Sequence, residues 1–179
     1  MIRSAAIVVL LVMVGAPANA QIHSLEIFGG YSLVDDTKSE TKLPAGWSAG
    51  AAFTLSSWFA AVGDVAGHYA TIQTFDADVR LTTHAVMGGG RAFARIGRLT
   101  EFAQLLAGVV RGSGTVFGST ETNTVFAYQP GAGVDYPLTD RLAGRAQLDV
   151  RVVRNNSGGI EGGHAFRFCA SLVYRVTPR

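Results

Sequence analysis

The stretch LAGRAQLDVRVV, residues 142–153, alternates between two kinds of residue. Its even-numbered positions are all apolar or small, whereas its odd-numbered positions include Arg145, Gln147, Asp149 and Arg151. Successive side chains of a β-strand point to opposite faces, so this pattern predicts a strand with one apolar and one polar face. The fold then depends on whether the apolar face meets lipid or the core of a soluble protein.

Segments with the same period recur along the chain and are bounded by Gly, Asn, Asp, Ser or Pro. They predict strands at 25–34, 47–57, 59–70, 78–90, 101–111, 123–137, 142–154 and 164–176. Long polar loops are expected at DDTKSETKLPAG, GSGTVFGSTET and NNSGGIEGG, and tight turns at Ser57-Trp58 and PLTDR. TIQTFDAD is expected to be a moderately long connection, and RAFARIGRLT is longer than a tight turn. An even number of strands with mostly alternating short and long connections is the plan of an outer-membrane barrel.

Alternation alone fits a soluble barrel as well, because the two classes differ only in which face is apolar. Three features favour the membrane: the polar faces are rich in small residues, the only two lysines lie in one predicted loop (Lys38 and Lys42), and aromatic residues gather near strand ends. Phe102 and Tyr174 are assigned to the aromatic girdle at the short-turn end. We therefore predict an all-β, eight-stranded, antiparallel up-and-down transmembrane β-barrel, with a soluble secreted lipocalin-like binding protein as the alternative.

The same reasoning assigns a face to each strand. In the segment 78–90, Leu81, Ala85 and Met87 are predicted to face lipid, while Thr82 and His84 face inward. Ala143, on the polar face of the opening stretch, is expected to point inward close to water.

The N-terminal residues have the pattern of a secretory signal peptide. Arg3 precedes an apolar run, and Ala18-Asn19-Ala20 matches a cleavage site. We expect cleavage after Ala20, so that residues 21–179 form one outer-membrane barrel domain. The net charge of +2 is small and no basic run is present, which argues against nucleic-acid binding.

Four stretches carry a resemblance to a known family: LEIFGGYS, GWSAGAAFTLSSWFAAVGDVAGHY, FAQLLAGV and GAGVDYPLTDRLAGRAQLDVR. With them the chain resembles the small eight-stranded outer-membrane β-barrel proteins of Gram-negative bacteria, the opacity-type group. The resemblance covers the whole mature chain and implies insertion by the barrel-insertion machinery. The family usually ends in an aromatic residue, whereas this chain ends in YRVTPR.

Motifs of catalysis or metal binding are weak. GWSAG, residues 46–50, matches a nucleophile elbow, but a strand rather than a helix is predicted to follow Ser48. The four histidines lack metal-ligand spacing, and the lone Cys169 is predicted to be a packed small residue. We therefore predict no catalytic, cofactor or metal site.

Charged residues on the predicted inward faces form the candidate site: Glu26, Asp64, Arg145, Asp149 and Arg151. Buried charges must be paired, so these residues predict either a structural ion-pair network or an electrostatic plug. The expected protein is a non-enzymatic monomer in outer-membrane lipid that displays loops to an extracellular ligand. A narrow pore and a lipid-modifying enzyme are the competing functions.

Overall fold

The computed structural model describes residues 24–36, 42–43, 45–74, 77–116, 119–153 and 164–176. Its strands are β1 (Leu25–Asp36), β2 (Lys42–Leu43), β3 (Ala45–Thr54), β4 (Phe59–Thr74), β5 (Ala77–Ile96), β6 (Leu99–Val116), β7 (Ser119–Pro137), β8 (Leu142–Val153) and β9 (His164–Arg175). The predicted signal peptide and its cleavage site lie outside the described residues. No helix that could cross a membrane occurs among the residues described.

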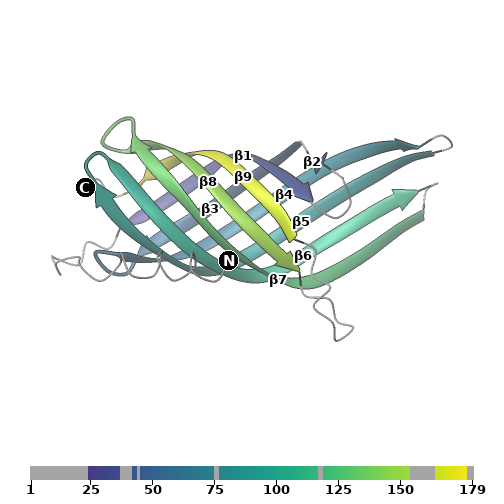
Figure 1. The fold of residues 1–179 in the computed structure, drawn as a ribbon, viewed down its shortest axis with the longest axis horizontal. Helices are drawn as coiled ribbons and strands as arrows, with labels where there is room; N and C mark the ends of the chain where they lie inside the picture. Colours follow the sequence, from purple (N-terminus) through teal and green to yellow (C-terminus); the bar gives the residue numbers. More distant parts are fainter. Residues whose placement is uncertain are drawn as a thin grey trace, which may run out of the picture.

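Eight long strands close into a barrel (Figure 1). Every strand from β3 to β8 pairs antiparallel with the next, and β1 pairs with both β3 and β9. The two-residue β2 adds only a short pairing to the end of β1, at Val34↔Leu43 and Asp35↔Lys42. The predicted eight-stranded antiparallel barrel is therefore confirmed.

One end of the barrel, called here the turn end, carries three short connections at residues 55–58, 97–98 and 138–141. The connection between β5 and β6 was expected to be longer, but only Gly97 and Arg98 separate the two strands. Gly97 has a φ of 61°, which a two-residue hairpin turn with the right-handed strand twist requires and which glycine adopts without strain.

At the opposite end, called here the loop end, several strands continue through segments expected to be loops. β4 and β5 are separated only by residues 75–76, and β6 and β7 only by 117–118, so both hairpins extend well beyond the rest of the barrel (Figure 1). These segments are rich in Thr, which favours strands, and a strand outside a bilayer need not be apolar. Polarity alone was therefore the wrong signal for a loop at these two places.

The outer surface of the barrel is apolar. Leu105, Leu148 and Leu172 are each more than half exposed, and further aliphatic and aromatic side chains surround them. The polar face of the opening stretch points inward, where Arg145, Gln147, Asp149 and Arg151 are buried. A soluble barrel requires the opposite arrangement, with its apolar face inward and its polar face toward water. The lipocalin-like alternative therefore does not fit this structure.

Two predicted faces are wrong. On β5, Ala85 and Met87 are buried inside the barrel, whereas His84 and Val86 are exposed outside. Phe102, assigned to the aromatic girdle, is likewise buried inside. The cause is an apolar cluster within the barrel, formed by Phe28, Ala52, Val62, Ala85, Met87, Leu106, Val110, Ala127, Ala143 and Val173. Because the interior holds both apolar and charged layers, an apolar residue does not by itself mark the lipid face.

Candidate functional site: the barrel interior

Arg167 on β9 is the centre of the buried polar contacts. Its two terminal nitrogens donate to the two carboxylate oxygens of Asp64 on β4, at 2.8 and 3.0 Å. Its Nε donates to Asp149 Oδ2 on the neighbouring strand β8, at 2.9 Å. All three side chains are at most 2% exposed, and we call them the central cluster. Because β4 and β9 are not neighbours in the sheet, Arg167 spans the lumen.

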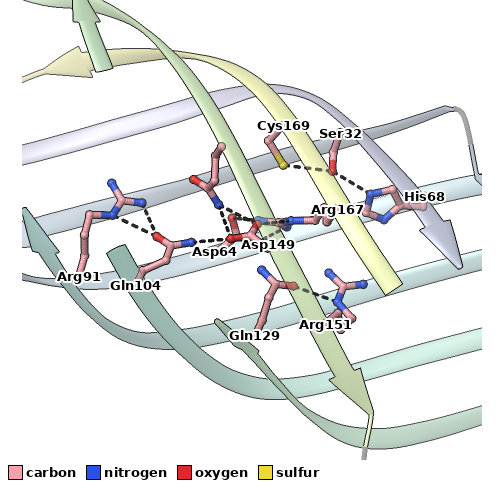
Figure 2. Close-up of polar contacts among 11 residues, drawn as sticks. Ser32, Asp64, His68, Arg91, Gln104, Gln129, Asp149, Arg151, Arg167 and Cys169 are labelled. Carbon is pink, nitrogen blue, oxygen red and sulfur yellow. Dashed lines mark hydrogen bonds and ion pairs between the residues drawn. The ribbon is translucent and has the colours of Figure 1, made fainter. Parts of the chain in front are cut away.

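Two glutamines extend the central cluster toward β5. Asp149 accepts from Gln147 Nε2 at 2.8 and 3.0 Å and from Gln104 Nε2 at 3.2 Å. The Gln104 side-chain oxygen in turn accepts from Arg91 Nε and Nη2, at 3.1 and 2.7 Å. Figure 2 shows this continuous line of contacts from Arg91 to Arg167.

A second group of charges, called here the turn-end cluster, comprises Glu26, Asp135, Arg145 and Arg175. Arg145 donates to both oxygens of Asp135, at 2.7 and 2.8 Å, and lies 3.7 Å from Glu26. Glu26 also accepts from Arg175 Nε at 3.0 Å, across the β1–β9 pair that closes the barrel. The bidentate Arg145–Asp135 geometry is the strong form of such a pair.

Aromatic rings hold Arg91 beside Arg145. The Cζ atom of Arg91 lies 4.1 Å from the centre of the Phe102 ring and 5.5 Å from that of Phe28, and Arg145 Cζ lies 4.8 Å from each. Both rings occupy space that two glycines leave free: a Cβ at Gly50 or Gly133 would come within 2.5 Å of Phe28 or Phe102 respectively. These glycines are therefore required for the stacked arrangement.

Arg151 and His68 each contact an uncharged side chain. Arg151 Nε donates to the side-chain oxygen of Gln129 at 3.0 Å. His68 Nε2 lies 2.9 Å from Ser32 Oγ, which in turn lies 3.3 Å from Cys169 Sγ (Figure 2). His68 Nδ1 has no partner and Ser32 is completely buried, so the pair lacks both the orienting carboxylate and the access that a nucleophilic serine needs.

The other motifs also have no catalytic arrangement in the part of the chain that the structure describes. Ser48 of the GWSAG motif is buried on β3 rather than exposed at a strand-to-helix turn. Cys169 is a buried free thiol, and no group of three or more metal-binding side chains occurs among the described residues.

All five predicted site residues point into the barrel, although the Glu26 side chain retains 15% of its exposure. Arg167 joins Asp64 to Asp149, and Glu26 lies near Arg145. Arg151 is placed with Gln129 instead of a carboxylate. The candidate set missed Arg91, Gln104, Asp135, Arg167 and Arg175. Alternation signalled Asp135, Arg167 and Arg175, but Arg91 falls in a segment that was predicted to be a connection.

Comparison with solved structures shows the fold alone, because the sequence identities are low. Ail, the attachment invasion locus protein of Yersinia pestis, was solved in complex with the heparin analogue sucrose octasulfate. It is 16% identical with a TM-score of 0.62, over 86% of this chain and 99% of its own. Neisserial surface protein A is 12% identical with a TM-score of 0.63, over 84% and 95%.

The N-terminal β-barrel domain of Pseudomonas aeruginosa OprF is 11% identical with a TM-score of 0.54, over 86% of this chain and 97% of its own. No family model matches the chain, and no curated protein is similar to it in sequence. The chain has the fold of small outer-membrane β-barrels, as the resemblance in its sequence implied.

Proposed function

We propose that this protein is a monomeric, non-enzymatic outer-membrane barrel that displays polar hairpins to a partner outside the cell. The observation that carries the proposal is the combination of a lipid-suited outer face with hairpins that extend past it. Secretion by the N-terminal signal peptide and folding by the barrel-insertion machinery would bring it to the outer membrane. The barrel is then the anchor, and the hairpins are the interacting part.

The described part of the β6–β7 hairpin supports this role. Thr122, Asn123 and Thr124 are exposed on β7, and Arg111 is exposed on β6. Ser113 Oγ and Thr122 Oγ1 lie 3.1 Å apart across the two strands, which adds a polar cross-strand contact to the backbone pairing. Ail, which was crystallised with a sulfated ligand, and Neisserial surface protein A share the barrel fold, so an extracellular polar ligand is a reasonable partner class here.

Cysteine labelling tests the location and orientation. We expect Asn123→Cys to react with a membrane-impermeant maleimide on intact cells, because residue 123 is exposed on the extended hairpin. Thr139→Cys, in the short turn at the opposite end, should react only after the outer membrane is permeabilised. Cys169 is 2% exposed, so the parent protein supplies an unlabelled background.

The reverse labelling pattern would contradict the proposed orientation, and recovery of the protein in the soluble periplasmic fraction would contradict the membrane location. Binding can then be measured with fluorescent heparin, which represents the sulfated class of ligand. A variant with the β6–β7 hairpin shortened should lose binding while its barrel still shows heat-dependent mobility on gels. Equal binding by both forms would exclude this hairpin as the interaction site.

A narrow pore is the second candidate, and the packed interior argues against it. An eight-stranded barrel is just wide enough for its own side chains to fill the lumen. Here Arg167 spans that lumen and an apolar cluster occupies part of it. We expect the purified protein to give at most rare, small openings in planar bilayers.

Variants test the plug directly. If the turn-end cluster blocks the lumen, Arg145→Ala or Glu26→Ala should raise the conductance. If the cluster is only structural, these changes should lower stability without altering conductance. Steady, large conductance by the unaltered protein would overturn the closed-barrel proposal and favour the pore.

A further inference from the structure

The barrel interior contains an unequal number of opposite charges. Among the described residues, its arginines are Arg91, Arg145, Arg151, Arg167 and Arg175, and its carboxylates are Glu26, Asp64, Asp135 and Asp149. Five cations against four anions leave one positive charge without a counter-charge. Since burying an unpaired charge is costly, this excess needs an explanation.

Two interior arginines make no described contact with a carboxylate, Arg91 and Arg151. In the middle of the lumen, Arg167 contacts both Asp64 and Asp149, whereas Arg151 donates to the neutral side chain of Gln129. In the turn-end cluster, Arg145 and Arg175 share Glu26 and Asp135. Arg91 likewise donates to the neutral amide of Gln104, and it packs on the same two rings as Arg145. At Arg91, a cation without a carboxylate contact therefore lies beside a second cation.

The same place holds two hydrogen-bond donors without partners. Nη1 of Arg91 and Nη1 of Arg145 are both buried and unbonded. Arg91 and Arg145 are 3% and 4% exposed, so bulk water does not solvate them. Both guanidiniums pack on the Phe28 and Phe102 rings, which brings two like charges together instead of separating them.

We propose that Arg91 and Arg145 bind one small monovalent inorganic anion of the size of chloride between their Nη1 groups. Such an ion would balance the excess charge, accept from both free donors and relieve the repulsion between the two guanidiniums. A monovalent ion matches the single excess charge, and the packing of both guanidiniums on the Phe28 and Phe102 rings favours a small one. Glu26 is the least buried charged group of the cluster, so the ion would enter from the turn end.

Other unpartnered polar atoms do not form an equivalent site. Arg151 Nη2, Gln129 Nε2 and His68 Nδ1 are also buried and unbonded, but only one of these atoms belongs to an arginine. The described ring contacts place two guanidinium groups together only at Arg91 and Arg145. A neutral water molecule satisfies such donors without creating a net charge. The combination of two free guanidinium donors on the same rings with the excess charge of the interior therefore assigns the anion to Arg91 and Arg145.

Halide-dependent stability tests the site. Urea unfolding of the full chain in lipid vesicles should be compared in sodium gluconate, chloride and bromide at constant ionic strength. A ligand that binds only the folded state raises the folding equilibrium constant by the factor 1 + [L]/Kd, so it should rise about tenfold at nine times Kd. We expect this rise in chloride and bromide but not in gluconate.

Arg91→Gln should abolish the halide dependence because it removes the excess charge and one donor. The matched control is Arg98→Gln, which removes an exposed arginine at the same end of the barrel and should keep the dependence. Equal stability of the parent protein in chloride and gluconate would overturn the proposal, as would a halide response that persists in Arg91→Gln.

Crystals grown in bromide give a second readout that does not depend on the folding of any variant. An anomalous peak between the two Nη1 atoms is expected. A water molecule there without anomalous signal, or bromide bound only elsewhere, would refute the anion site.

Discussion

Arg167→Met is expected to lower the free energy of unfolding of the barrel by about 3–5 kcal/mol, the usual cost of removing one partner from a buried ion pair. Methionine retains much of the length of the side chain but leaves Asp64 and Asp149 without their shared cation. Both carboxylates are at most 2% exposed, so water cannot replace the lost contacts without opening the barrel. Urea unfolding in lipid vesicles would measure the change.

Two controls separate this effect from the loss of any arginine. Arg111→Met alters an exposed residue of the β6–β7 hairpin, and we expect a change within about 0.5 kcal/mol. A triple variant that adds Asp64→Asn and Asp149→Asn removes all three charges and should recover part of the lost stability. If Arg167→Met were as mild as Arg111→Met, the central cluster would contribute little to the fold.

The alternation of apolar and polar residues along the sequence was enough to predict the barrel. Alternation in the segments around Asp64, Gln129 and Asp149 placed the right side chains inward, because one face of each of these strands meets lipid and the other a polar interior. Strand lengths were less accurate. The polar composition predicts loops at the threonine-rich ends of β4 and β7, which are strands in the structure, because polarity distinguishes a strand from a loop only within the bilayer.

Faces were wrong where the interior is itself apolar. Met87 on β5 and Phe102 on β6 are buried within the barrel, although their hydrophobicity suggested lipid contact. Ala143 points inward as predicted, but it is completely buried in the apolar cluster instead of lying close to water. Hydrophobicity identifies residues that avoid water, and a small barrel has two environments for them: the lipid-facing surface and the apolar cluster inside the barrel.

Which residues of the site contact one another could not be predicted from the sequence, and the reason is geometric. Alternation gives the face of a residue but not its depth, which depends on the tilt and stagger of the strands. Arg167 and Asp64 are 103 residues apart and lie on strands that do not pair, so no local pattern links them. Arg91 was missed because its segment was not assigned to a strand at all.

Leu148→Lys is expected to cost about 2–4 kcal/mol, the penalty for a basic residue on the lipid face at the middle of the bilayer. Leu148 lies near the middle of β8, is 52% exposed on the outer face and pairs with Ala132 and Phe168, both of which are also exposed outward. A lysine there has no polar neighbour on that face and is too far from either end to reach water easily. Urea unfolding in lipid vesicles would measure this cost.

Leu138→Lys is the matched control, since it makes the same change at a leucine that is 56% exposed but lies in the short turn between β7 and β8. At that depth the ammonium group reaches the interface, so the cost should fall to about 0–1 kcal/mol. Exposure is nearly equal at the two sites, and the difference between them therefore measures depth in the membrane. Equal and small costs at both positions would mean that the apolar face of the opening stretch meets water, which would contradict the transmembrane barrel.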